Sequence, residues 1–157
     1  MIASGTTTRD VRLRAEQAWR LLLVAGSRRT VARALVIDTL AAIDGHLSVT
    51  SIHERISADH PEINISTVHR TVAFLVEHYV AHVLPWPGEA LYGLNDQPHH
   101  HAVCAECGTI AEIPAPDLAT AVAAAEKSSA FQIDDAGLTL SGRCAACRAH
   151  PAGSGSN

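Results

Sequence analysis

Aromatic residues are scarce in this chain of 157 residues, in which Phe, Trp and Tyr together make up only 4%. Charged residues are also few, at 18%, whereas hydrophobic residues account for 47%. That much apolar side chain is enough to bury a core, so the composition excludes a disordered chain. The length allows one ordinary domain or two very small ones.

Long hydrophobic runs are absent as well. No run reaches the roughly 18 apolar residues that a membrane-spanning helix needs. The candidate stretch 18–26 is too short and is interrupted by Arg20. The first five residues lack the basic-then-apolar order of a secretory signal. We therefore expect a soluble cytoplasmic protein without a membrane partner.

An overall excess of positive charge is missing, since the formal net charge is −4, but the charge is unevenly distributed. From Arg9 to Arg33, seven arginines stand against two acidic residues, whereas from Asp96 onward three basic residues stand against seven acidic ones. Such asymmetry is typical of a basic binding face joined to a neutral or acidic module. It favours nucleic-acid binding by the N-terminal part; the alternative is a set of arginine-rich helix faces in solvent.

The N-terminal half shows helical spacing of its apolar residues, followed by a change of period. The pattern predicts helices over 11–25, 31–43, 48–60 and 66–76, with Thr30, Ser48 and Ser66 as N-caps. Two short strands, 80–84 and 90–94, follow around a turn rich in Pro and Gly. Short helices followed by a hairpin are the order of a winged helix-turn-helix, in which the helix near Ser66 is the recognition helix.

The C-terminal half is predicted to be a small α/β unit. Strands are expected at 101–104 and 109–113, a helix at 116–128, and one or two strands within 131–142. We therefore expect an α+β fold with a winged-helix domain at 1–94, a hinge at 95–98, a second domain at 99–150 and a disordered tail at 151–157. A unit of roughly 50 residues usually needs a disulfide, a structural metal or a partner subunit to be stably folded.

The four cysteines fall in two C-x-x-C pairs, Cys104 with Cys107 and Cys144 with Cys147. In a reducing cytosol, such pairs are better explained by a metal than by disulfides. Zinc prefers four tetrahedral ligands, and thiolates suit it. We expect a structural zinc that clips the end of the second domain to its beginning. A redox dithiol and unpaired structural thiols are the alternatives.

Histidine is abundant, with ten residues, three of them consecutive at 99–101. On a strand, His99 and His101 project from one face and His100 from the other. With Glu112 from the next strand and His46 from an earlier turn, His99 and His101 could bind a second divalent ion that ties the domains together. The alternative is a solvated polar loop. His69 lies on the recognition helix, and we expect His78 and His82 at the surface.

Two motifs resemble the ferric-uptake-regulator (Fur) family of bacterial metal-responsive repressors over about residues 25–148. They are Ser66-Thr-Val-His-Arg-Thr71 and His99-x-His101-x-x-Cys104-x-x-Cys107-Gly108 with its late cysteine pair. The resemblance implies a winged helix, an α/β dimerisation domain, and a homodimer that binds an inverted-repeat operator in double-stranded DNA when a regulatory metal is bound.

The resemblance also implies roles for individual residues. The four cysteines match the structural zinc ligands, and the regulatory ligands are matched by His46, His99, His101 and Glu112. DNA contacts are expected from Arg28, Arg33, Ser66, Thr67, His69 and Arg70. The sequence departs from the family pattern at three positions. Gly93 stands where the family often has an acidic or Cys ligand, and His69 stands where the recognition helix has a Tyr. Ala136 takes the approximate place of a late His in a further C-terminal metal site that would also use His100.

The donor set leaves the regulatory metal open, because divalent affinities at N/O sites overlap. We expect Fe²⁺ or Zn²⁺ first, with Mn²⁺ and Ni²⁺ as alternatives, and peroxide sensing through ligand oxidation as the leading variant. A zinc metallochaperone or enzyme subunit is a remote alternative, since no H-E-x-x-H motif is present. A metal-independent DNA-binding protein is the third interpretation. We expect no enzymatic activity.

Overall fold

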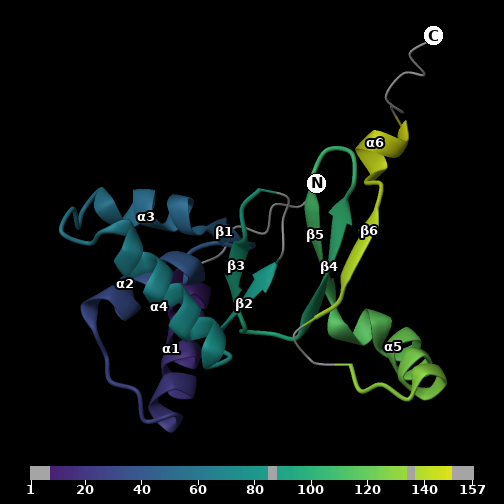
Figure 1. The fold of residues 1–157 in the computed structure, drawn as a ribbon, viewed down its shortest axis with the longest axis horizontal. Helices are drawn as coiled ribbons and strands as arrows, with labels where there is room; N and C mark the ends of the chain where they lie inside the picture. The colour runs from purple at the N-terminus through teal and green to yellow at the C-terminus, as the bar shows by residue number, and fades with distance from the viewer. Residues whose placement is uncertain (1–7, 85–87, 134–136, 150–157) are drawn as a thin grey trace. The chain divides into compact units, whose positions relative to one another are not determined.

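The computed structural model describes residues 8–84, 88–133 and 137–149, which fall into two units, 1–96 and 97–157 (Figure 1). In the first unit, four helices and three short strands follow one another as α1 (Thr8–Val24), α2 (Val31–Ala41), β1 (Leu47–Ser48), α3 (Val49–Ser57), α4 (Ile65–Glu77), β2 (Ala81–Leu84) and β3 (Leu91–Leu94). This order is that of a winged helix. None of the described helices is long and apolar enough to cross a membrane.

The helix starts of the first unit depend on short polar side chains. Thr30 Oγ1 accepts a hydrogen bond from the backbone N–H of Arg33, and Ser48 Oγ accepts one from Ser51, so both predicted N-caps are confirmed. The predicted cap of α4 is wrong, because Asn64 Oδ1 accepts from the N–H of Thr67 at 2.9 Å. An Asn at this position satisfies an otherwise unpaired N–H of the first turn, and the helix therefore begins before Ser66.

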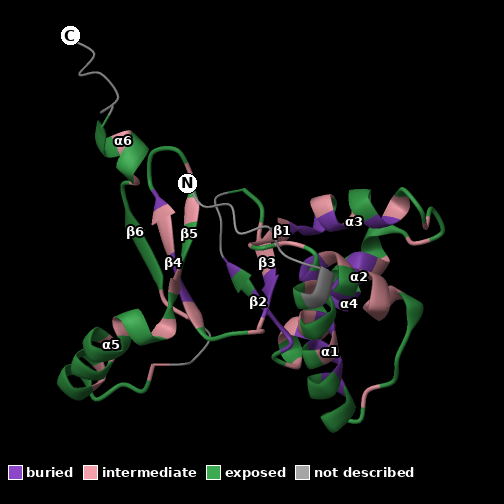
Figure 2. Ribbon diagram, turned by 180° about the vertical axis from the view of Figure 1, so that it is seen from behind, coloured by how far each residue is buried: buried purple, intermediate pink, exposed green. Residues whose placement is uncertain are grey.

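The first unit is held together by an aliphatic core. Each helix contributes side chains to it, and β2 and β3 close it; among the fully buried members are Leu22, Ile37, Leu40, Ile52, Leu75 and Val80. Figure 2 shows these buried segments along the inner faces of the helices. Trp19 is the aromatic ring buried in this cluster. The scarcity of aromatics is therefore compensated by close packing of Leu, Ile and Val.

The wing of the first unit is a three-stranded sheet in the order β1-β3-β2, with both pairings antiparallel. The predicted hairpin is confirmed as β2 and β3. Strand β1 was not predicted, since two residues carry no readable alternation. Its pairing of Leu47 with Tyr92 makes β3 the central strand.

The second unit contains β4 (His99–Cys104), β5 (Ile110–Pro114), α5 (Ala115–Ser129), β6 (Thr139–Gly142) and α6 (Ala145–Ala149). Its sheet has the order β5-β4-β6, with β4 antiparallel to β5 and parallel to β6. Helix α6 was not predicted. Residue 136 and the tail at 151–157, for which predictions were made, lie outside the described residues.

Little of the second unit is buried. Among its described residues only His100, His101 and Cys104 are buried, and none of them is a Leu, Ile, Val or aromatic residue. In Figure 2, α5 is almost wholly exposed, and β6 is exposed along its length. This unit therefore cannot rely on a hydrophobic core of its own.

The residue after α4 offers a test of backbone strain. Tyr79 has φ of 56°, a left-handed conformation that disfavours any residue with a Cβ, and its side chain is 78% exposed. We expect Tyr79→Gly to raise the free energy of unfolding by about 1 kcal/mol, because glycine adopts this conformation without a steric penalty. Urea unfolding measures the change. Tyr79→Ala is the matched control: it removes the same ring but keeps the Cβ, and a gain of equal size in this variant would contradict the explanation.

Candidate metal centres

The fold of the second unit brings its four cysteines together. Cys104 ends β4 and Cys107 lies in the following turn, whereas Cys144 follows β6 and Cys147 lies in α6. Because β6 runs parallel to β4, with Gly142 opposite Cys104, the second pair arrives beside the first. All four sulfur atoms lie within 4.8 Å of one another. The cluster predicted from the two C-x-x-C pairs is therefore present.

The sulfur geometry fits a tetrahedral metal site. The Sγ atoms of Cys107 and Cys144 are 3.6 Å apart, and all four cysteines are free thiols. A zinc ion with bonds of 2.3 Å to sulfur gives tetrahedral edges of about 3.8 Å, whereas a disulfide requires about 2.05 Å. The residues present therefore fit a closed four-thiolate zinc site.

The pKa values of the four cysteine thiols also favour the binding of a cation by this cluster. Backbone N–H groups, that of Cys107 foremost, lower the pKa of Cys104 to about 6. A hydrogen bond from the Thr109 hydroxyl lowers the pKa of Cys107. Hydrogen bonds with the sulfurs of Cys107 and Cys144 raise the pKa of Cys147. Some sulfurs are thus prepared to be charged, but four thiolates at this distance need a positive ion to offset their repulsion.

A second group of donors lies on the other end of β4. The rings of His99 and His101 project from the same face, with centroids 4.8 Å apart, as the alternation of a strand predicts. Glu112 lies opposite His101 in β5, and its Oε1 is 4.0 Å from His99 Nε2. His99 Nδ1 lies 2.7 Å from the carbonyl oxygen of Gln97, to which it donates. A backbone carbonyl on Nδ1 is the usual support of a histidine that binds metal through Nε2.

His100 has a different role from its neighbours. Its Nδ1 accepts a hydrogen bond from the backbone N–H of Leu138 at 3.0 Å, just before β6. Next to it, Gly137 has φ of 93°, and a Cβ there would lie 2.4 Å from the carbonyl oxygen of His99. The hydrogen bond of His100 therefore joins β4 to the residues just before β6. At position 137 of that segment only a glycine fits.

The first unit holds another pair of imidazoles, one member of which was not predicted. His46 Nε2 and His82 Nε2 are 2.7 Å apart. The expectation that His82 lies at the surface is wrong, because its side chain is only 7% exposed. The predicted hairpin could have revealed the position of His82. Pairing its two strands places His82 opposite Gly93, and a glycine leaves room for a neighbouring imidazole.

The candidate DNA contacts lie around the start of α4. Ser66, His69 and Arg70 are exposed and Thr67 is half-buried, whereas Val68 faces the core. Arg70 Nη2 lies 3.4 Å from Thr67 Oγ1.

The two remaining candidate contacts, Arg28 in the loop before α2 and Arg33 in the first turn of α2, differ from each other. Arg28 is exposed. Arg33 is half-buried: its guanidinium lies 3.8 Å from the centroid of the Phe74 ring and donates to the carbonyl oxygen of Arg28. Arg33 therefore braces the loop that carries Arg28.

Comparison with known proteins gives one consistent result. The family model of the ferric uptake regulator family matches residues 24–141. The ferric uptake regulation protein of Bordetella parapertussis is 30% identical over 129 residues, which cover 78% of this chain and 91% of that protein. A peroxide-responsive repressor, PerR of Staphylococcus saprophyticus, is 23% identical over 124 residues, covering 78% of this chain and 84% of that one.

Solved structures agree at the level of the fold. The ferric uptake regulator of Helicobacter pylori, whose structure reveals three functional metal-binding sites, superposes with a TM-score of 0.70 at 21% sequence identity. The match covers 92% of this chain and 97% of that one. The order of a winged helix followed by a small α/β unit is therefore the same in both.

The cysteine cluster predicts the effect of losing one ligand. We expect Cys147→Ser to lower the zinc content from one chelator-resistant ion per chain to well below one, because an incomplete site loses binding free energy that, in zinc-finger peptides, is on the order of 10 kcal/mol. Elemental mass spectrometry after treatment with a chelator measures the content. Ser141→Ala, an exposed substitution on β6 close to the site, is the control. Retention of a full zinc ion in the Cys147 variant would exclude the four-thiolate site.

Proposed function

We propose a function from the family of the chain, which belongs to the ferric uptake regulator family of metal-responsive transcriptional regulators. In this proposal the chain is a repressor that binds an inverted-repeat operator as a homodimer when a regulatory divalent metal is bound. The observation that carries this proposal is the presence of separate thiolate and imidazole donor groups on a chain that begins with a winged helix. The role is regulatory rather than enzymatic, and the place of action is the cytoplasm.

The regulatory ligands in this proposal are His46, His99, His101 and Glu112. Each unit by itself presents imidazoles that are held in position by its own strands. A mixed set of imidazole and carboxylate donors suits Fe²⁺ or Zn²⁺, with Mn²⁺ and Ni²⁺ as competitors. Peroxide sensing is the second candidate function, favoured by the similarity to peroxide-responsive repressors.

Helix α4 is the recognition helix in this proposal. Its exposed residues His69 and Arg70 face away from the core and would reach base edges, while Ser66 and Thr67 at its N-terminus would contact phosphates. In the loop before α2, Arg28 would contact a phosphate and Arg33 would hold it in place through its carbonyl oxygen.

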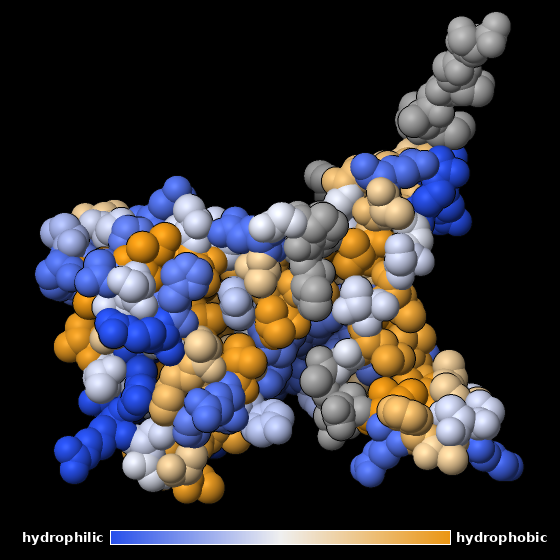
Figure 3. All heavy atoms as spheres, in the orientation of Figure 1, coloured by the Kyte–Doolittle hydropathy of each residue, from blue (hydrophilic) through white to orange (hydrophobic). Residues whose placement is uncertain are grey.

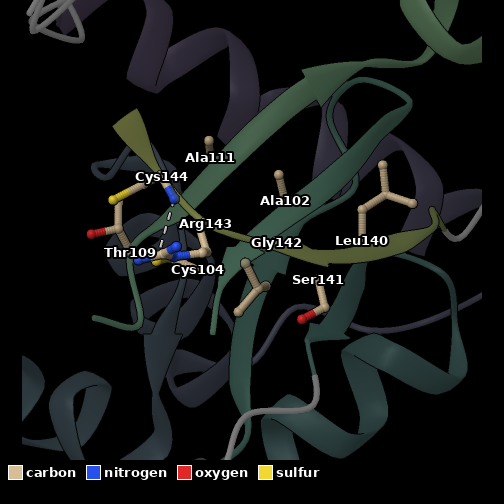
Figure 4. Close-up of a pocket in the computed structure, with 10 residues that line it drawn as sticks. Ala102, Cys104, Thr109, Ala111, Leu140, Ser141, Gly142, Arg143 and Cys144 are labelled. Carbon is tan, nitrogen blue, oxygen red and sulfur yellow. Dashed lines mark hydrogen bonds between the residues drawn. The ribbon is translucent and has the colours of Figure 1, made fainter. Parts of the chain in front are cut away.

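The second unit is the dimerisation domain in this proposal. Ala102, Ala111 and Leu140 lie beside one another on three adjacent strands and line a pocket next to Cys104, in which their side chains point the same way (Figure 4). Apolar side chains also gather over β6 and α5 in Figure 3, and Phe131 is 74% exposed. Apolar surface of this kind on a unit with little core of its own favours burial against a second copy.

Arg70 provides the test of the DNA face. We expect Arg70→Ala to weaken operator binding by about 1–3 kcal/mol if it reads a base, without loss of zinc. Binding to labelled operator DNA at several salt concentrations measures the affinity and its salt dependence. Lys127→Ala removes an exposed cation from α5 in the second unit, outside the arginine-rich stretch, and is the control. Operator affinity that is the same in both variants would remove Arg70 from the interface.

His101 provides the test of the metal response. We expect His101→Ala to abolish the increase in operator affinity on addition of the regulatory metal, because one imidazole donor is lost while the four thiolates remain. The measurement is operator binding with added metal and with a chelator. His60→Ala, on an exposed turn before α4, should respond as the unaltered protein does. A full metal response in the His101 variant would exclude His101 as a ligand.

A further inference from the structure

Residues 46, 93 and 82 form a row across the wing of the first unit. Gly93 on the central strand β3 pairs directly with His82 on β2. On the other side of β3, Leu47 pairs with Tyr92, and continuing that register by one residue places His46 beside Gly93. Side chains of directly opposite residues lie on the same face of a sheet. The two imidazoles therefore flank a central position that has no side chain.

The missing side chain is what allows the imidazoles to meet. A Cβ built on Gly93 would lie 2.9 Å from both Cδ2 and Nε2 of His46 and 3.1 Å from Cε1 of His82. Any larger residue would therefore displace the His46 ring. With glycine, the two Nε2 atoms approach to 2.7 Å over the backbone of β3.

Asn95 determines which nitrogen of His82 faces His46. The amide Nδ2 of Asn95 donates to the carbonyl oxygen of Tyr79 at 3.0 Å, so its Oδ1 is the atom directed at His82 Nδ1, 2.8 Å away. An oxygen acceptor requires the proton to be on Nδ1. In the neutral ring the lone pair is then on Nε2, the atom that faces His46. This is the arrangement of a histidine ligand with its supporting partner.

We propose that His82 is a ligand of the regulatory metal, admitted by Gly93 and positioned by Asn95. The proposal rests on the regulatory site of the proposed function and changes the donor that the wing supplies. The family resemblance implies an acidic or thiol ligand at position 93 of the central strand, and in this proposal a neutral imidazole from the neighbouring strand takes its place. The first unit then contributes two imidazoles and no carboxylate. Such donors favour Zn²⁺, Co²⁺ or Ni²⁺ over Mn²⁺, which prefers oxygen ligands.

The test uses the full chain with its structural zinc in place and Co²⁺ as the probe. Competition with a chromophoric chelator gives the affinity, and the visible absorption of bound Co²⁺ reports its coordination. We expect one exchangeable Co²⁺ per chain in the unaltered protein. His82→Ala should weaken its binding by more than the 10–100-fold typical of losing a supporting partner, and should change the absorption spectrum. His60→Ala is the control.

Two further variants separate a ligand role from a structural one. Gly93→Ala should weaken Co²⁺ binding while the unfolding temperature is retained, since the atoms that must move are the end of a side chain. Asn95→Leu should weaken binding about 10–100-fold, whereas Asn95→Asp, which keeps an acceptor for His82 Nδ1, should restore it.

The outcomes distinguish this proposal from the proposed function. If Co²⁺ binds the unaltered protein and His101→Ala abolishes binding, but His82→Ala binds as tightly as His60→Ala, then His82 is not a ligand and the regulatory site stands without it. If no exchangeable ion binds to the unaltered protein, both the regulatory site and the role of His82 are overturned.

Discussion

The close approach of four sulfur atoms, which would repel one another as thiolates, is the constraint on which the second unit depends. With Cys104 as the one buried side chain that belongs to the cluster and no buried Leu, Ile or Val among the described residues, this unit gains little from hydrophobic burial. Its sheet instead brings together thiols whose pKa values are pushed in opposite directions. A divalent cation bound by the four sulfurs would remove this conflict and would join β4 to α6. Metal binding would then contribute directly to the folding of this unit.

The first unit has the opposite balance. Its aliphatic core is contributed by all four helices and needs no metal to hold it. Within it, Arg14 binds the carbonyl oxygens of Ala41 and Ile43 and forms an ion pair with Asp96, so the last residues of the unit are fixed to α1. Under the proposed function, a scaffold of this kind would keep its fold while the metal at its histidines binds and leaves.

The sequence predicted those features that depend on local spacing. The alternation of His99 and His101 and the caps at Thr30 and Ser48 follow from contacts within a few residues, and the structure confirms them. The four-cysteine cluster, also confirmed, was predicted from the number of ligands that zinc requires. The placement of His82, which depends on strand register, was missed. His82 lies opposite Gly93 and against the ring of His46, and no local pattern around His82 carries that information. The α4 cap was misplaced because Asn64 and Ser66 are both good N-caps, and only the backbone shows which one serves.

If both sites bind metal as proposed, the two kinds of donor explain why one site would be permanent while the other responds. Four thiolates complete the coordination of zinc and leave no open position, and their removal requires protonation of sulfurs, one of which has a pKa lowered to about 6. In the proposed regulatory site the imidazoles would be neutral ligands, and without metal His46 and His82 are paired by a hydrogen bond between the two rings. Loss of the metal would then leave no uncompensated charge at these imidazoles, unlike at four thiolates. A regulator needs this difference, because its fold must persist while its sensing site empties and fills.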